Sequence, residues 1–227
     1  MIEIEQMTKS FGRKKVVRSV SFHANTNEIT CLIGLNGAGK TTILQAIMNL
    51  TPSKGTVRFA GKPYTHATNR DLIFITDDLS MPRVMTVAES MEFMQLHYPK
   101  WETDKAEELV KYLKLDKNEK LKNLSKGYKM RVNLMLGLAA GCTYILMDEP
   151  LSGIDALTRE NILDLLTSEF VESKTILLTT HEVGEIEAIV DRAVLLNDGE
   201  IVDSFYVESL REEEQKSLLD KMREVYR

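Results

Sequence analysis

The sequence has few cysteines and no segment typical of export. Its 227 residues include only Cys31 and Cys142, too few for a disulfide-built scaffold. Each lies in or beside an apolar stretch, ITCLIG and GCTYILM, so we expect two buried free thiols in a reducing compartment, with a disulfide as the alternative. Charge at Glu3 and Glu5 argues against an N-terminal signal peptide.

Long hydrophobic runs are also missing. The longest uncharged stretch covers residues 132–147 and is interrupted by Gly137 and Gly141. It is shorter than the roughly 20 residues that a membrane-spanning helix needs. We therefore expect a soluble cytoplasmic protein, which can still bind a membrane protein.

The chain has no excess of positive charge. Lys and Arg total 29 against 34 Asp and Glu, giving a net charge of -5, so there is no electrostatic case for a nucleic-acid partner. We find no internal repeats and no low-complexity linker. With 43% hydrophobic residues, the chain can bury the core of one domain, or of one domain with a subdomain.

The hydrophobic pattern predicts an α/β fold. Apolar strands alternate with helices at both ends of the chain, which is typical of a parallel sheet covered by helices. Residues from about 78 to 140 read as mostly helical, and they form an insertion between the two halves of that sheet. The expected strands include IEIEQM, VVRSVSF, EITCLIG, GTVRFAGKPY, TYILMD, KTILLTT and the hairpin RAVLLNDGEIV. The expected helices include KTTILQAIMNL, LTRENILDLLTSEF, EVGEIEAIV and an amphipathic tail over residues 205–227.

A glycine-rich loop follows the buried strand EITCLIG. Residues 34–41, GLNGAGKT, match the pattern G-x-x-x-x-G-K-[ST]. Glycines allow successive backbone N–H groups to point at phosphate oxygens, and the helix that follows adds the positive end of its dipole. A glycine-rich turn that caps a helix is the alternative. The expected phosphate-binding residues are Asn36, Gly37, Ala38, Gly39, Lys40, Thr41 and Thr42, with the Thr41 hydroxyl also on Mg²⁺.

Two adjacent carboxylates, Asp148 and Glu149, end the apolar strand YILMDEP. Beside a bound Mg-nucleotide their burial has a purpose, since Asp148 can hold the metal, directly or through water. Glu149 can accept a proton from the water that attacks the γ-phosphate. Acids that merely follow a buried strand are the structural alternative. Together with the glycine-rich loop they predict an ATP-hydrolysing site.

Three further motifs complete a family resemblance: LSKGY at residues 124–128, LSGID at 151–155, and His181 after the strand TILLTT. With the two motifs above, and in this order, they resemble the nucleotide-binding subunit of an ATP-binding cassette (ABC) transporter, up to about Val202. The resemblance implies one P-loop NTPase (RecA-like) domain over residues 1–227, with an N-terminal antiparallel β subdomain and an inserted helical subdomain. It implies ATP and Mg²⁺ as cofactors.

The resemblance also implies roles for particular residues. Residues 34–42 resemble Walker A and 144–149 resemble Walker B, with Glu149 as the catalytic base. Residues 152–155 resemble the D-loop, which communicates across a dimer. His181 resembles the switch histidine at the γ-phosphate, the alternative being a surface histidine that starts a helix. Phe11 resembles the aromatic residue that stacks on adenine, the alternative being an ordinary strand aromatic.

The LSKGY stretch implies a partner. Ser125 and Gly127 open a helix whose N-terminal N–H groups can bind an anion. In the family that anion is the γ-phosphate of ATP held by a second nucleotide-binding subunit, identical or different. The resemblance thus implies a head-to-tail dimer with ATP at the interface, working on an integral membrane permease at the inner face of the cell membrane.

The chain departs from the family pattern at three positions. Lys126 replaces a glycine and either adds positive charge near the anion or points to solvent, the second being our expectation. Tyr128 replaces a glutamine. Asp77 stands where the family has the Q-loop glutamine, and could approach the metal; a register one residue later would place Asp78 there.

A methionine cluster follows this segment. Met81, Met85, Met91 and Met94 could line a groove for a short permease helix, or pack in the core, which explains the last two well. From these features we expect ATP hydrolysis that powers translocation by a permease. An ATP-gated regulatory or mechanical clamp is the alternative, and a DNA-associated ATPase is disfavoured by the acidic balance.

Overall fold

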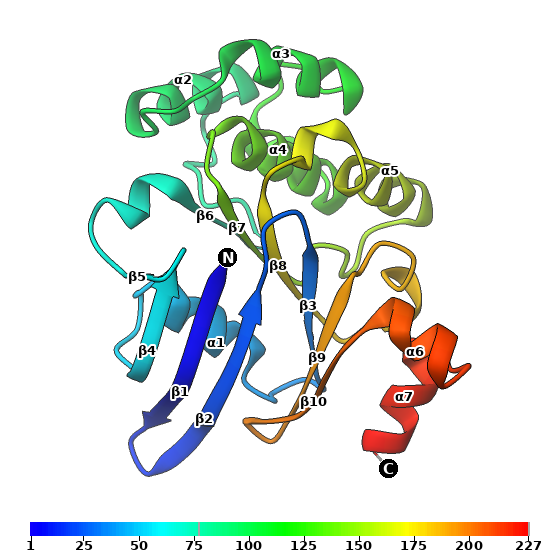
Figure 1. The fold of residues 1–227 in the computed structure, drawn as a ribbon. Helices are drawn as coiled ribbons and strands as arrows, with labels where there is room; N and C mark the ends of the chain where they lie inside the picture. Colours follow the sequence, from blue (N-terminus) through cyan, green and yellow to red (C-terminus); the bar gives the residue numbers. More distant parts are fainter. Residues whose placement is uncertain (77, 227) are drawn as a thin grey trace.

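Two β-sheets organise the chain, with helices packed on the second (Figure 1). The computed structural model describes residues 1–76 and 78–226. The N-terminal sheet has four strands, in the order β2 (Lys14–Ala24), β1 (Ile2–Phe11), β4 (Lys54–Phe59) and β5 (Lys62–Pro63). All neighbouring strands in it are antiparallel. The expected antiparallel N-terminal sheet is therefore confirmed.

The second sheet, which we call the core sheet, has six strands. Its strands β9, β3, β8, β7 and β6 are parallel, and β10 is antiparallel at the edge. Every residue of β3 and β8 is buried, as expected for strands covered on both faces. Their order is β10 (Glu200–Tyr206), β9 (Arg192–Asn197), β3 (Ile29–Ile33), β8 (Thr175–Thr180), β7 (Tyr144–Asp148) and β6 (Leu72–Ile75).

Helices connect the parallel strands. Helix α1 (Lys40–Ile47) follows β3, and α5 (Ala156–Leu166) follows β7. The helices between β6 and β7 are α2 (Val87–His97), α3 (Thr103–Tyr112) and α4 (Lys126–Ala139). Short 3-10 turns complete the connections: η1 (Thr68–Asp71), η2 (Leu121–Asn123), η3 (Glu169–Val171) and η4 (Val183–Glu185).

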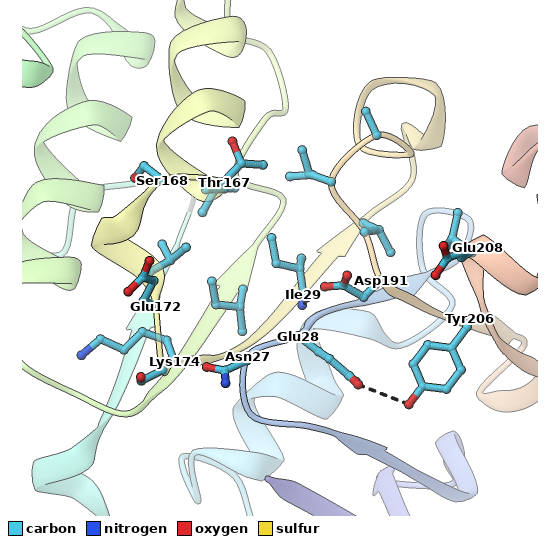
Figure 2. A pocket seen from close by; sticks show the side chains of 18 of the residues that line it. Asn27, Glu28, Ile29, Thr167, Ser168, Glu172, Lys174, Asp191, Tyr206 and Glu208 are labelled. Atoms are coloured by element: carbon cyan, nitrogen blue, oxygen red, sulfur yellow. Dashed lines mark hydrogen bonds between the residues drawn. The ribbon is translucent and has the colours of Figure 1, made fainter.

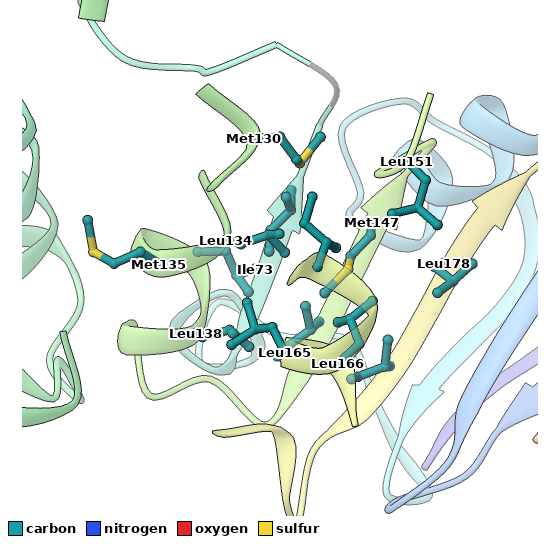
Figure 3. Close-up of a cluster of buried hydrophobic side chains, with 14 of the residues drawn as sticks. Ile73, Met130, Leu134, Met135, Leu138, Met147, Leu151, Leu165, Leu166 and Leu178 are labelled. Atoms are coloured by element: carbon teal, nitrogen blue, oxygen red, sulfur yellow. The ribbon is translucent and has the colours of Figure 1, made fainter. Parts of the chain in front are cut away.

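The core sheet separates two hydrophobic clusters, because side chains alternate along each strand. Ile145 and Met147 of β7 belong to the cluster that includes residues of α4 and α5. Figure 3 shows Leu134, Leu138 and Leu165 of these helices in the same cluster as Met147. Leu146, between them in the chain, packs in the other cluster. There it joins α1 and the N-terminal sheet through buried residues that include Leu32, Ile43, Leu44, Ile2 and Ile4. Helix α1, which follows the glycine-rich loop, is thus held between the two sheets.

The C-terminal tail differs from the expected single helix. It forms α6 (Val207–Glu213) and α7 (Leu218–Val225). A new helix begins at Leu218 because Ser217 and Asp220 form a capping box. The Ser217 hydroxyl accepts from the Asp220 N–H, and the Asp220 carboxylate accepts from the Ser217 N–H.

One other expectation about secondary structure was wrong, and one strand was missed. The stretch EVGEIEAIV forms only the 3-10 turn η4 and irregular turns, since Gly184 disfavours a helix. Strand β6 was not predicted at all, because the short run LIFI has no periodicity of its own. The expectation that both cysteines are buried free thiols is confirmed for Cys31 and Cys142. Among the described residues, no helix combines the length and the apolar character that crossing a bilayer requires.

Candidate functional site

Three parallel strands bring the predicted site residues to one edge of the core sheet. β3 pairs with β8, and β8 pairs with β7, so their carboxyl ends lie side by side. The glycine-rich loop follows β3, Glu149 follows β7, and His181 follows β8. Loops at the carboxyl ends of parallel strands are where open α/β sheets bind ligands. Motifs that are far apart in the sequence therefore meet at this edge.

The glycine-rich loop of residues 34–41, which we call the phosphate loop, depends on two glycines for different reasons. Gly39 is the residue before α1 and has φ of 111°, a left-handed conformation that side chains rarely adopt. Gly34 allows close approach, because a Cβ there would lie 2.6 Å from the carbonyl oxygen of Leu196 in β9. The tip of the loop, residues 35–37, is exposed, as is Thr41. The loop thus presents its backbone and the Thr41 hydroxyl to the outside.

Lys40 is the most buried charge of this site. Its side chain is only 6% exposed, and its Nζ donates to the carbonyl oxygen of Gly34 at 2.7 Å. Its Nζ also lies 3.1 Å from Oε1 of Glu149. A buried charge needs a partner of this kind, because an unpaired one would strongly destabilise the fold.

Glu149 links Lys40 to His181. While Oε1 faces Lys40, Oε2 lies 2.9 Å from Nδ1 of His181. The backbone of Glu149 has φ of 50°, which is uncommon for a residue other than glycine. Its N–H is held by the carbonyl oxygen and the hydroxyl of Thr179, at 3.2 and 3.1 Å. The carboxylate is therefore fixed between a cation and an imidazole.

Thr179, in β8, is a site residue that the sequence reasoning missed. Besides holding Glu149, its hydroxyl donates to Oδ1 of Asp148 at 2.6 Å. One side chain thus binds the carboxylate of Asp148 and the backbone of Glu149. The signal in the sequence was the pair of threonines that ends the buried strand TILLTT, where apolar residues are the usual choice.

The residues present fit a magnesium ion held jointly with phosphate. Among residues 1–76 and 78–226, no group of three or more His, Cys, Asp or Glu side chains could hold a metal alone. Asp148 offers one carboxylate and Thr41 one hydroxyl, which suits an ion that keeps several waters and takes the rest of its ligands from phosphates. Asp77, the other predicted metal ligand, lies outside the described residues.

The LSKGY stretch begins α4, as expected. Ser125 is the N-cap, and its hydroxyl accepts from the Tyr128 N–H at 3.2 Å. Gly127 is buried against α5, where an added Cβ would lie 3.1 Å from Cγ2 of Thr158. No hydrogen bond or ion pair of the described chain joins Ser125 to the phosphate loop, so the two predicted phosphate sites are separate features of one subunit.

The structure shows where the two unusual side chains of this stretch point. Lys126 is exposed, but its chain lies along the D-loop candidate, with Nζ 3.0 Å from where a Cβ on Gly153 would be. The expectation that it only points to solvent is therefore incomplete. The Tyr128 hydroxyl turns to the loop after α3 and accepts from the Asp116 N–H at 2.6 Å. Tyr128 thus anchors a loop through its side chain.

Phe11 ends β1 with its ring accessible. The side chain is 53% exposed, and the ammonium of Lys9 lies 4.7 Å from the ring centroid. The following strand leads to the phosphate loop, since the Val16 carbonyl oxygen would lie 3.1 Å from a Cβ on Gly39. Phe11 is therefore an exposed aromatic residue on a hairpin that touches the loop.

The methionines after β6 divide between core and surface. Met91 and Met94 are buried, in line with core packing. Met81 and Met85 are partly buried against the same cluster. Beside them is a hollow of about 210 Å³ whose lining includes Ile75, Met81, Phe93, Met94, Tyr98 and Gly137.

A much larger hollow lies at the opposite edge of the core sheet, where the parallel strands begin (Figure 2). It has a volume of about 860 Å³ and is lined at the starts of β3 and β8 by Ile29 and Ile176, with Asp191 before β9. The described residues around it include none that we expected to bind nucleotide. Size alone would therefore have pointed away from the residues predicted to bind nucleotide.

Comparisons with known proteins show similarity in sequence and in fold. Residues 17–152 match the family described as "ABC transporter". The ABC transporter ATP-binding protein YtrB of Bacillus subtilis (strain 168) is 32% identical over 217 residues, which cover 94% of this chain and 74% of that protein. The solved ATP-binding subunit of an ABC transporter has the same fold, with a TM-score of 0.89, 22% identity and full coverage of both chains. The dimeric structure of a bacterial ABC transporter cassette, MJ0796, has a TM-score of 0.80 and 25% identity, over 91% of this chain and 99% of that one.

Proposed function

We propose, from the premise that this chain belongs to the ABC transporter family and is an ATPase of that family, that it hydrolyses ATP between two subunits to drive a separate membrane permease. The observation that carries the proposal is the contact series from Lys40 through Glu149 to His181 beside the phosphate loop. It joins a phosphate-binding cation, a proton acceptor and a group that orients that acceptor.

This contact series supports a mechanism for the hydrolytic step. Phosphate oxygens compete with Glu149 for the Lys40 ammonium, which lies 3.1 Å from the carboxylate. The carboxylate oxygen so released can accept a proton from a water that attacks the γ-phosphate. His181 holds the other oxygen at 2.9 Å and keeps the carboxylate aimed. Magnesium, bound by Thr41 and Asp148, would neutralise charge on the phosphates.

The exposed start of α4 supports a partner subunit. Ser125 and Lys126 are exposed at the N-terminus of this helix, where N–H groups and an ammonium can meet an anion. Leu35 in the phosphate loop and Leu157 in α5 are also exposed and offer apolar surface that a partner subunit would cover. Ser125 and Gly127 of one subunit would then complete the ATP site of the other. Phe11 would stack on the adenine.

The surface around α2 supports a permease partner. The hollow of about 210 Å³ is mostly apolar, and Val84 and Leu96 nearby are 74% and 83% exposed. A short amphipathic helix suits such a groove. The chain would then work at the cytoplasmic face of the membrane, held there by the permease. Co-purification with a multi-span membrane protein tests this point, and partnership with soluble proteins alone would favour an ATP-gated clamp.

The experiment that tests the ATP-driven dimer is light scattering on the Glu149→Gln variant. Gln keeps the size of Glu149 but cannot accept the proton, so we expect hydrolysis to fall by about 10²- to 10⁴-fold and the mass to double when ATP and Mg²⁺ are added. Glu149→Gln combined with Lys40→Met is the control and should stay monomeric. Wild-type turnover in Glu149→Gln would contradict the assigned base. A persistent monomer that binds ATP would contradict a homodimer and require a different partner chain.

A further inference from the structure

The last helix of the structure docks on a segment that belongs to the site. Leu218 and Met222 of α7 are buried in the same cluster as Val183 and Ile186. Those residues form and follow η4, which begins two residues after His181. Lys221 anchors the helix from the other side, with Nζ 3.2 Å from Glu214 and 3.4 Å from Asp203. Helix α7 therefore packs directly against the segment that follows His181.

A second contact joins the end of α7 to the base of the phosphate loop. The hydroxyl of Tyr226 lies 3.1 Å from the carbonyl oxygen of Ile33 and 2.9 Å from that of Leu196. Ile33 is the last residue of β3, and Gly34 opens the loop.

The Leu196 carbonyl has a double role. It is the same oxygen that would lie 2.6 Å from a Cβ on Gly34. The Tyr226 hydroxyl thus sits between the two backbone oxygens that frame the first turn of the loop. Burial raises the pKa of Tyr226 to about 12, so the hydroxyl keeps its proton and donates at neutral pH.

We infer that Tyr226 is a positioning residue for the phosphate loop, so that docking of α7 and binding of nucleotide strengthen each other. The inference rests on the proposed binding of ATP at this loop. The hydroxyl fixes the strand end from which the loop departs, and α7 steadies the segment after His181. Both effects set the positions of groups that must meet the phosphates together.

Reciprocity makes the inference measurable without following turnover. If docked α7 raises the affinity for ATP by some factor, ATP must raise the docking equilibrium of α7 by the same factor. Hydrogen exchange of the α7 amides reports that equilibrium directly. If α7 only added to global stability, nucleotide would slow amide exchange to the same extent throughout the chain. If α7 is coupled to the phosphate loop, nucleotide slows amide exchange in α7 specifically.

The test compares Tyr226→Phe with Tyr206→Phe in the full chain. Phe keeps the ring and removes only the hydroxyl. Tyr206 is the matched control, because its hydroxyl bonds to Glu28 at 3.3 Å near the opposite edge of the core sheet. We expect Tyr226→Phe to weaken ATP binding by about three- to ten-fold, the effect of one hydrogen bond, with a higher KM and a smaller change in kcat. ATP should slow exchange in residues 218–225 of the wild type and less in Tyr226→Phe.

The outcomes separate this inference from the proposed function. Wild-type protein that fails to bind ATP would overturn the proposed function itself. Wild-type protein that binds ATP, with an unchanged dissociation constant in Tyr226→Phe and no nucleotide effect on exchange in α7, would overturn the inference alone. A lower Tm with unchanged affinity would assign Tyr226 a purely structural role. Equal weakening in Tyr206→Phe would show that the effect is not specific to the loop.

Discussion

The two edges of the core sheet use carboxylates in different ways. At the carboxyl edge, Glu149 contacts two side chains, the Lys40 ammonium at 3.1 Å and the His181 imidazole at 2.9 Å. At the opposite edge, Asp191 accepts from the backbone N–H of Ile29 at 2.7 Å, and so holds the start of β3. One edge joins acids to groups that can exchange partners, and the other joins them to a fixed backbone.

A second carboxylate of the opposite edge also holds backbone, although it contacts side chains as well. Asp71 lies just before β6, and its Oδ1 accepts from both the N–H and the hydroxyl of Thr143, each at 3.0 Å. Thr143 lies just before β7, so this contact aligns the starts of two neighbouring strands. Lys100 completes the arrangement at 2.7 Å from the same oxygen.

The comparison teaches that chemistry identifies the site better than volume does. The hollow of about 860 Å³ in Figure 2 lies at the edge whose acids hold backbone. The loops at the other edge contain the glycine turn, the left-handed Glu149 and a cation that is 6% exposed. Strain and buried charge of this kind gather at functional sites.

Removal of one lysine from each edge should sharpen this contrast most. Lys40→Met keeps a long side chain but removes the charge that we propose binds the phosphates, so we expect kcat/KM for ATP to fall by on the order of 10²- to 10³-fold. Lys174→Met, beside the large hollow, should leave it within about two-fold, since Lys174 is only partly buried and lies before β8, at the end of that strand away from the phosphate loop. Steady-state phosphate release measures both. Similar losses in the two variants would erase the distinction between the edges.

Local motifs allowed much of this site to be predicted from the sequence. The glycine-rich loop, the pair Asp148 and Glu149, and His181 each carry their chemistry within a few residues, and each follows an apolar strand. The structure places all of them at one edge, as parallel strands require. The roles of Glu149 in proton transfer and of His181 at the γ-phosphate stay predictions.

What the sequence could not supply are the contacts between distant segments. Thr179 was missed because its importance depends on β8 lying beside β7. Tyr128 could be identified only as a replacement for a glutamine, yet it bonds to Asp116 in a loop that the packing of α3 on α4 brings near. The break at Ser217 lay in a charged stretch whose amphipathic pattern continues across it. Tertiary partners decided each case.

Replacement of Asp191 should lower the stability of the fold without affecting the predicted site at the carboxyl edge. Asp191→Ala leaves the N–H of buried Ile29 without its acceptor, so we expect the free energy of unfolding to fall by about 1 kcal/mol. The KM for ATP should not change, because the site lies at the other end of β3. Urea unfolding and ATPase assays measure the two effects. Asp191→Asn retains an acceptor oxygen and should recover most of the stability; a loss as large as that of Asp191→Ala would contradict this account.

The smallest expected effect is a pH dependence at Asp71. Burial favours its neutral form, but hydrogen bonds from Lys100 and Thr143 outweigh burial and lower the pKa of Asp71. Because the folded pKa is lowered, the ion pair stabilises the fold above the unfolded pKa of about 3.9 and loses this contribution as the pH falls towards the folded value. Asp71→Asn should therefore be less stable than wild type by about 0.2–1 kcal/mol at pH 7, and the gap should close below about pH 4. Urea unfolding across this pH range measures the difference in stability. Lys100→Met is the matched partner: if Asp71 and Lys100 act as one unit, Asp71→Asn should cost little more stability in the Lys100→Met background. A difference between Asp71→Asn and wild type that persisted at low pH would assign the effect to packing rather than to charge.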